Sequence, residues 1–369
     1  MTYYPETSVI MGLARIQRIR QLPRFAVPKP APVNIIENNQ VEAVTTVLMG
    51  NVLREYRILD VAQHLKIRRP KPDKVAAMIN VNEGQWTLFG QELARRGPGR
   101  RAPVLLSPAE GRVIRVEDGK IIIQLSEREI EIQARIQGII DEVEPHRVKL
   151  SGNGAVLQCA WGNGAFRYEV YKFLPEDGFV GLSRLEVSIS EYRNVVIISP
   201  LPLTKGDLLV AQQQEVAGVV APSMPANLRE FAMGLKFPVL LTEGFGQRRP
   251  TTLIYSLLQD NIGRQAAFDA STPDRWTGER PEILIPLPAG GLPPTPALDQ
   301  ALWVSARVRI LRAPWDGLIG EVVELPATPQ RMDNGLRLLC ARVRLSSEQV
   351  VLVPLANLEL LGPPADMPN

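Results

Sequence analysis

Along most of the chain, apolar and polar residues alternate with the period of two that is typical of strands with one buried face. Short runs of this kind, separated by Gly, Pro, Asn and Asp, fill residues 41–200 and return between 304 and 361. Between residues 205 and 290, strand-like and helix-like segments follow one another instead, which predicts a small parallel sheet with helices. We therefore expect a multidomain, mainly β protein with one small α/β unit.

Changes of pattern and composition divide the chain into seven segments. We expect an N-terminal arm or linker, a β-rich domain, a β hairpin unit, a small α/β domain, a Pro/Gly linker, a small barrel and a tail, over residues 1–33, 34–150, 151–204, 205–290, 291–301, 302–362 and 363–369. The arm mixes isoleucines with arginines and ends in a stiff Lys-Pro-Ala-Pro stretch. It could dock onto a partner or a neighbouring subunit and so support an oligomer, or it could be disordered.

The clearest local pattern lies near the C-terminus. A strand is predicted where Val304, Ala306, Val308 and Ile310 alternate with polar residues, and a turn follows at 314–317. Gly317 and Gly320 suit positions that need a positive φ or a close approach of two backbones. Further strands within 336–345 and 350–361 would complete a small five-stranded barrel.

This order of residues resembles the KOW module of ribosomal proteins and bacterial transcription elongation factors. The matching positions are Val308, Ile310, Pro314, Gly317, Gly320 and Val322, within roughly the last sixty residues. The whole chain also resembles bacterial proteins of unknown function that end in a KOW module. The resemblance implies an SH3-like barrel that binds RNA, ribosomal protein or another protein. The candidate contact residues are Arg307, Arg309, Arg312 and Trp315. Alternatively, the arginines form a solvated strand face and Trp315 caps the barrel core.

A second resemblance covers residues 75–125. Gly84, Gly90 and Leu93, followed by Ser107, Pro108, Gly111 and Val113, are similar to the biotinyl/lipoyl barrel-sandwich fold. Carrier domains of that family present a modified lysine at a hairpin tip. Here the tip reads Glu117-Asp118-Gly119-Lys120, so we expect an Asp-Gly turn with an ordinary strand start at Lys120, and no prosthetic group.

Two other patterns concern turns and charge. A hairpin is predicted between 156–161 and 167–173, around the turn Gly162-Asn163-Gly164. Basic residues gather within 66–71 and 95–101 and could contact phosphates, although solvated loops are the plainer interpretation.

Within the α/β unit we expect strands at 216–221, 237–241 and 283–285. One helix would be capped by Ser223 and another would begin at Pro250. Ligands of such units bind beyond the carboxyl ends of the strands. The candidate anion or ligand site is therefore the loop after the second strand, with Thr242, Glu243, Gly244, Gly246, Arg248, Arg249 and Thr251. A tight turn with solvated arginines is the alternative.

Composition narrows the function. The net charge is only +3, so any nucleic-acid contact must be local. Two distant cysteines and the lack of a signal peptide or a long apolar run favour a cytoplasmic protein without membrane insertion. No common catalytic, metal or cofactor motif is present, so we expect no metal and no cofactor, and an enzyme is disfavoured without being excluded.

We therefore hypothesise a non-catalytic adaptor or scaffold that binds protein partners through its β modules. A KOW protein associated with RNA, the ribosome or transcription is the first alternative. A small-ligand or nucleotide-binding enzyme that uses the 242–252 loop is the second.

Overall fold

The structure is a computed structural model. It describes residues 3–361 except 31, 33, 54, 69, 100–101, 176–177, 180–190, 273–279 and 297–299, so the expected tail at 363–369 lies outside it. Strands make up 44% and helices 12%, which confirms a mainly β chain with several sheets.

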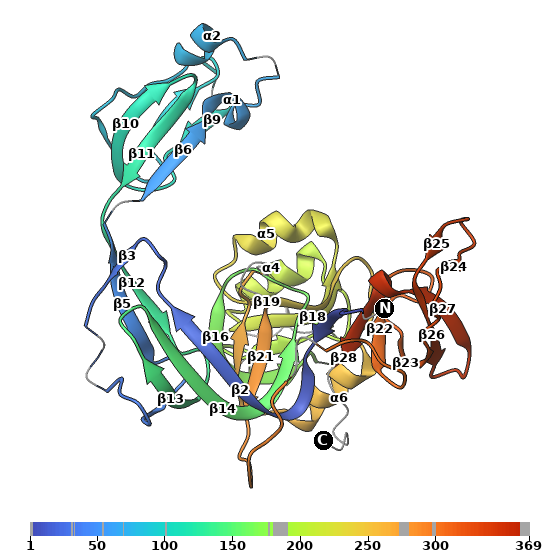
Figure 1. The fold of residues 1–369 in the computed structure, drawn as a ribbon. Coiled ribbons are helices and arrows are strands. Elements are labelled where there is room, and N and C mark those ends of the chain that lie inside the picture. Colours follow the sequence, from blue (N-terminus) through green and yellow to red (C-terminus); the bar gives the residue numbers. More distant parts are fainter. Residues whose placement is uncertain are drawn as a thin grey trace.

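One large sheet runs through the middle of the molecule (Figure 1). Its strand order is β15-β19-β18-β17-β16-β20-β21-β14-β13-β4, and β2 pairs with β14 beside this path. The strands are β2 (Ile10–Gln21), β4 (Gln40–Val41), β13 (Gly138–Val143), β14 (Arg147–Gln158), β15 (Trp161–Gly162), β16 (Phe166–Phe173), β17 (Val196–Ile198), β18 (Gly218–Met224), β19 (Val239–Phe245), β20 (Gln265–Asp269) and β21 (Glu282–Pro286).

The two ends of this sheet have different covers. At one end, β2, β13 and β14 enclose a core together with the small sheet β3 (Ala26–Pro28), β5 (Thr46–Val52) and β12 (Arg128–Gln133). At the other end, β17, β18 and β19 are parallel and carry helices on both faces. Helix α6 (Thr252–Asp260) packs on one face, whereas α4 (Lys205–Gln213) and α5 (Arg229–Met233) pack on the other.

The expected N-terminal arm is wrong for residues 10–21, which form β2. This strand pairs antiparallel with β14 from Arg147↔Gln21 to Leu157↔Ile10. Its alternating residues Ala14 and Ile16 are buried in the core, which explains why isoleucines and arginines are interleaved here. Residues 10–21 are therefore part of the large sheet rather than a separate arm or linker. The expected boundary at 150/151 also falls inside a continuous strand.

The expected hairpin between 156–161 and 167–173 is also wrong, because β20 and β21 lie between β14 and β16. The turn residue Asn163 instead joins two distant segments. Its side-chain nitrogen donates to the carbonyl oxygens of Ala232 (3.0 Å) and Phe237 (2.9 Å), and its oxygen accepts from the amide of Val239 (3.0 Å). The amide group thereby ties the start of β19 to β15.

Within the α/β unit, the three predicted strands and the helix after Pro250 are present. The strand at 283–285 lies in β21, which is antiparallel to both of its neighbours rather than part of the parallel set. Ser223 does not cap a helix. It lies in β18, and its hydroxyl accepts from the amide of Arg248 at 2.9 Å.

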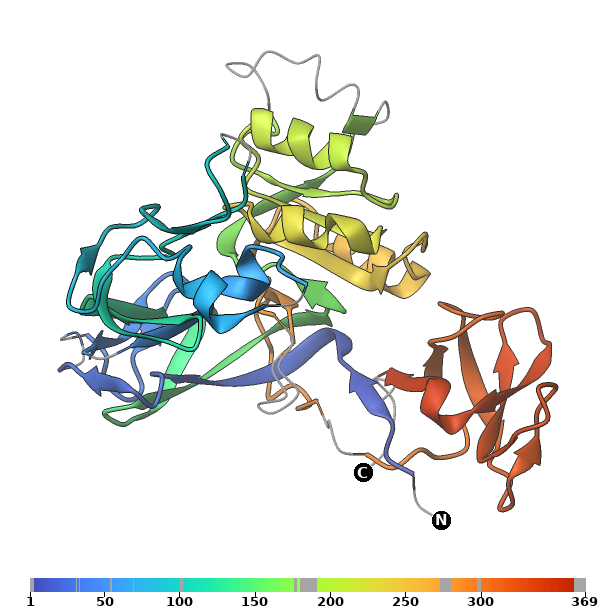
Figure 2. The same ribbon diagram turned by 90° about the horizontal axis from the view of Figure 1, so that it is seen from above.

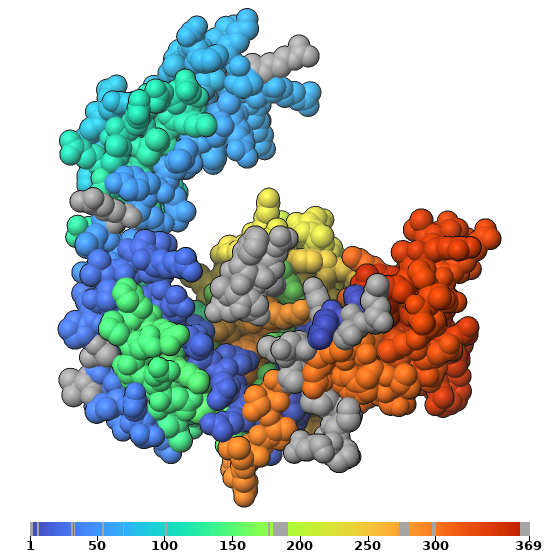
Figure 3. Space-filling model, in the orientation of Figure 1, coloured from blue at the N-terminus to red at the C-terminus, as the bar shows by residue number. Residues whose placement is uncertain are grey.

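Residues 56–125 form a module with its own core. It contains β6 (Tyr56–Asp60), α1 (Val61–His64), α2 (Pro72–Ala76), β7 (Trp86–Thr87), β8 (Glu92–Arg95), β9 (Val104–Leu106), β10 (Gly111–Glu117) and β11 (Lys120–Leu125). The module protrudes from the rest of the molecule, and its ends meet because Leu125 donates to the carbonyl oxygen of Glu55 at 2.8 Å (Figures 1 and 3). The predicted Asp-Gly turn is confirmed, since Asp118 and Gly119 have φ of 50° and 71°.

Residues 302–361 form the C-terminal module, on the opposite side of the molecule from residues 56–125 (Figure 2). Its elements are β22 (Arg307–Ile310), β23 (Ile319–Glu324), β24 (Gln330–Arg331), β25 (Arg337–Leu338), β26 (Cys340–Leu345), β27 (Val350–Pro354), the 3₁₀ turn η2 (Leu355–Asn357) and β28 (Leu358–Leu361). The N-terminal strand β1 (Glu6–Ser8) adds to this module by pairing in parallel with β28.

Both glycine predictions in this module are confirmed. Gly317 has a φ of 82°. At Gly320, a Cβ atom would lie 2.6 Å from the carbonyl oxygen of Arg344, so only glycine allows the two strands to approach as they do.

Candidate functional sites

Arg309 joins the C-terminal module to the α/β unit. It lies in β22 and is only 5% exposed. Its Nη1 donates to Oε2 of Glu243 at 2.7 Å, and its Nε and Nη2 donate to Oε2 of Glu359 at 2.9 and 2.5 Å. Arg280 adds a second cation to Glu359 at 3.3 Å. The result is a buried ion-pair network that is shared by two modules.

The other carboxylate oxygen of Glu243 accepts hydrogen bonds from the loop that precedes α6. Its Oε1 accepts from the hydroxyl of Thr251 at 2.6 Å and from the amide of Thr251 at 3.2 Å. Thr251 is the N-cap residue of α6. Because the start of a helix attracts negative charge, the Glu243 carboxylate occupies the place that we assigned to a bound anion.

The structure therefore brings together two sites that the sequence analysis placed apart. Arg309 was predicted on a solvent-facing strand as a partner or nucleic-acid contact, and this prediction is wrong because the α/β unit covers it. Glu243 was predicted to contact a ligand, and its carboxylate is instead bound to Arg309 and Thr251. The missing information was the docking of β22 beside β19, which local residue patterns do not contain.

The rest of the 242–252 loop is likewise engaged or closed. Arg248 donates from Nη1 to the carbonyl oxygen of Glu243 at 3.2 Å, and Gly244 and Gly246 have φ of 94° and 114°. Thr242 is buried beside a cavity of about 10 Å³, which holds one water molecule at most. Of the three charged side chains predicted for the site in this loop, only that of Arg249 is exposed. The loop is thus a structural turn rather than an open ligand site.

The electrostatics of the network follow from its burial. Desolvation opposes the charge on Arg309, but the carboxylates of Glu359 and Glu243 outweigh it, so the pKa of the guanidinium lies above its ordinary value. Nearby, burial raises the pKa of the Cys159 thiol, and the negative charges of Glu282 and Glu243 add to this effect. Cys159 is therefore an inert core residue rather than a nucleophile.

The C-terminal module has an open groove of about 430 Å³, and Arg309, Glu243 and Glu359 are not among the residues that line it. Three segments form it, namely the loop between β22 and β23, the β24–β25 hairpin, and the end of β27 with η2. The apolar lining includes Ile310, Pro314, Trp315, Met332, Leu338, Leu352 and Pro354, and the charged groups are Arg312, Arg331 and Asp333.

Trp315 is half-buried within this groove. One part of its ring packs against the core of the module, and the rest lines the groove beside the exposed Arg312. The two interpretations of this residue are therefore compatible. Arg307 is exposed on β22, two residues before the buried Arg309.

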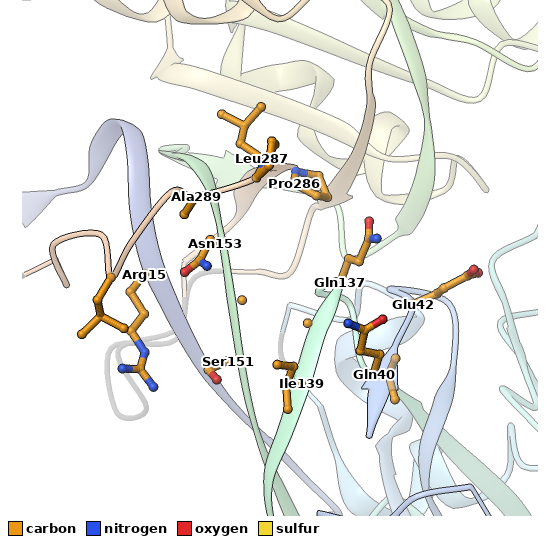
Figure 4. A pocket seen from close by; sticks show the side chains of 15 residues that line it. Arg15, Gln40, Glu42, Gln137, Ile139, Ser151, Asn153, Pro286, Leu287 and Ala289 are labelled. Carbon is orange, nitrogen blue, oxygen red and sulfur yellow. The ribbon is translucent and has the colours of Figure 1, made fainter. Parts of the chain in front are cut away.

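A larger cavity, of about 740 Å³, lies between the large sheet and residues 286–292 (Figure 4). Gln40, Gln137, Ser151 and Asn153 line it, and Arg15 and Glu42 point outward at its two ends. The Ser151 hydroxyl is already bound to Asp141 at 2.7 Å. The cavity thus offers neutral amide groups and no buried charge with which to hold a charged ligand.

The described residues lack both a metal-binding cluster and a membrane-spanning helix. They contain no group of three or more His, Cys, Asp or Glu side chains that is arranged to hold a metal ion. In the same residues, every helix is too short or too polar to cross a bilayer.

No protein-family model matches the chain, and a search of curated proteins found no match either.

Proposed function

We propose that this protein is a non-catalytic scaffold that binds an extended segment of a partner protein in the groove of its C-terminal module. The groove itself carries this proposal. One aromatic side chain, that of the half-buried Trp315, lines an open channel together with the prolines Pro314 and Pro354. Grooves of this composition dock extended, proline-containing peptides.

The placement of the module supports a scaffold. Buried ion pairs fix β22 to the α/β unit, and β1 extends the same sheet from the N-terminal side. The groove is therefore held in a defined position relative to the other modules. We also propose that the module is KOW-like, because the residues that resemble this family fall on β22, its turn and β23.

Charge favours a protein partner over RNA at this groove. Residues 302–361 contain seven arginines and six carboxylates, a net charge of +1. Arg309 is buried in ion pairs, and Arg342 is bound to Glu324 at 3.0 Å. The six carboxylates nearly cancel the arginines, and so small a net charge disfavours strong phosphate binding. The rim charges Arg312 and Arg331 suit a peptide that carries an acidic residue beside its apolar anchor.

The unpaired cysteines bear on location. Cys159 and Cys340 are both free and buried. Such cysteines fit a reducing compartment, and on this ground we propose that the protein acts in the cytoplasm.

The test is a selection of displayed 12-residue peptides on the full chain, followed by calorimetric titration of the enriched sequences. We expect proline-containing or aromatic peptides to bind with micromolar Kd, and Trp315→Ala to weaken this binding at least tenfold. Trp86→Ala is the matched control, because Trp86 is an exposed tryptophan of another module.

Two outcomes would overturn the proposal. One is the absence of any enriched peptide. The other is equal binding to the wild-type chain and to Trp315→Ala. RNA binding that is abolished by Arg307→Glu with Arg312→Glu would instead assign this module to RNA.

A further inference from the structure

The outer face of the four-stranded sheet in residues 56–125 carries exposed aromatic and aliphatic side chains. The strand order is β6-β11-β10-β7. Pairing places Trp86, Arg112, Gln124 and Tyr56 in one row across all four strands. Trp86 is 54% and Tyr56 is 51% exposed. We call this surface the outer face.

A second row continues the outer face. Ile122 pairs with Ile58, which is 65% exposed, and with Arg115 beyond a bulge in β10; Ile114, at this bulge, is 41% exposed. The opposite face of the same sheet holds the buried core, with Val113 and Ile121 fully covered. The outer face is therefore not a misplaced part of the core, and this protruding module leaves it open to solvent (Figures 1 and 3).

Charge is concentrated in the same module. Residues 56–125 contain thirteen Lys and Arg against seven Asp and Glu, a net charge of +6. Since the whole chain has a net charge of +3, the remaining residues are net negative. The module is thus the positive part of an otherwise acidic molecule, and its partner should be negative.

Several of these cations are available for binding. Arg112 lies between the two aromatics of the outer face, and its Nε donates to the carbonyl oxygen of Gly84 at 3.2 Å. Within the described residues no carboxylate forms an ion pair with it. At one end of the module, Arg96 donates to the carbonyl oxygen of Lys66 at 3.2 Å. This contact brings two basic loops together; the cations that the structure describes are Lys66, Arg68 and Lys71 in one loop and Arg95 and Arg96 in the other.

From this arrangement we propose that the outer face binds a single-stranded nucleic acid. Bases stack on Trp86 and Tyr56, and Arg112 and the basic loops neutralise phosphates. The two aromatic residues are three β-strand spacings apart, about 14 Å. A nucleic-acid strand that lies across the row therefore contacts both of them, with Arg112 between. This site is distinct from the proposed peptide groove and goes beyond that function.

A single strand fits better than a duplex or a protein. Bases within a duplex are stacked on each other and do not present their flat faces to a sheet. Protein interfaces are also rich in Trp, Tyr and Arg, so the charge around the row is what favours a nucleic acid. Interface cores are depleted of charged residues, whereas residues 56–125 carry a net charge of +6. The interleaving of aromatic and basic side chains is the composition that single strands require.

The test uses the full chain and fluorescently labelled 20-nucleotide strands of U and of dT, with a 20-base-pair duplex beside them. Anisotropy is measured from 50 to 300 mM salt. We expect micromolar binding to single strands at 50 mM salt, with log Kobs falling by about 2 to 4 per decade of salt. We expect Trp86→Ala to weaken it between about fivefold and a hundredfold, which is the range for loss of one base stack.

Matched variants make the result specific. Tyr56→Ala and Arg112→Glu should each weaken binding, whereas Trp315→Ala and Arg307→Glu in the C-terminal module should leave it unchanged. Preference for U over dT, or the reverse, identifies the kind of strand.

Four results would overturn the proposal. The first is no binding at 50 mM salt, and the second is an affinity for the duplex equal to that for single strands. The third is wild-type affinity in the double variant Trp86→Ala/Tyr56→Ala. The fourth is a loss of binding in Trp315→Ala or Arg307→Glu and not in the outer-face variants.

Discussion

Replacing Arg309 with Met removes the cation of the buried network while keeping a side chain of similar length. Oε2 of Glu243 then loses its partner at 2.7 Å, and this side chain is only 2% exposed. Its other oxygen remains bound to Thr251, which holds the carboxylate in the interior. Glu359 keeps Arg280 and is less affected. One buried charge without a counter-ion costs about 3–5 kcal/mol.

This cost should appear where the C-terminal module meets the α/β unit. We expect the amides of β22 and β28 in Arg309→Met to exchange with solvent deuterium about 150- to 4000-fold faster, because local opening becomes easier. Hydrogen exchange is preferable to a single urea transition, since a chain with several cores does not unfold in two states.

Two further variants separate charge from packing. Arg307→Met changes the exposed arginine of the same strand and should alter stability by less than about 0.5 kcal/mol. In the triple variant Arg309→Met, Glu243→Leu, Glu359→Leu, no charge is left unpaired among these three positions, and most of the lost protection should return. If β22 in Arg309→Met keeps its wild-type protection within a factor of two, the network does not hold the module in place.

Three other changes follow from the structure. Asn163→Asp keeps the shape but turns two donated hydrogen bonds into repulsion between oxygen atoms. It should cost about 2–4 kcal/mol, measured as roughly 30- to 1000-fold faster hydrogen exchange of the amides of β19. Cys159 and Cys340 should resist a thiol reagent at pH 8, because burial raises the pKa of both thiols. After unfolding, the reagent should titrate two thiols per chain. A reactive thiol in the native chain would contradict this. Gly317→Ala should cost about 1 kcal/mol for its positive φ, and Gly320→Ala should cost more, because its Cβ would meet the neighbouring strand at 2.5 Å; thermal melts that reverse this order would disprove the argument.

Local patterns predicted most of the elements but not their pairing. The Asp118-Gly119 turn depends on neighbouring residues alone, and it is present. The strand predicted at 304–310 is present only over Arg307–Ile310, because Val304 lies in an exposed turn. The hairpin around Asn163 failed because β20 and β21, a hundred residues later, insert between its strands. Periodicity shows which residues share a face, but it does not show what covers that face.

The same limit applies to the candidate sites. Arg307 and Arg309 share one face of β22 and look alike in sequence, yet only Arg309 is covered, by a carboxylate 66 residues away. The outer face of residues 56–125 was missed for a related reason. Trp86 and Tyr56 are thirty positions apart, and only the register of four strands brings them into one row. The high basic content of these residues was the available signal.

Strands β2 and β14 each pass through two hydrophobic cores. Ile16 and Leu150 belong to the core beside β5 and β12, whereas Ile10 and Leu157 belong to the core under α6. Neither core can unfold unless β2 separates from β14, and the other core depends on the same pair of strands. The body of the molecule should therefore unfold as one cooperative unit. Residues 56–125 share no strand with it and can lose their structure separately, so proteolysis should cut that module first while the body stays intact.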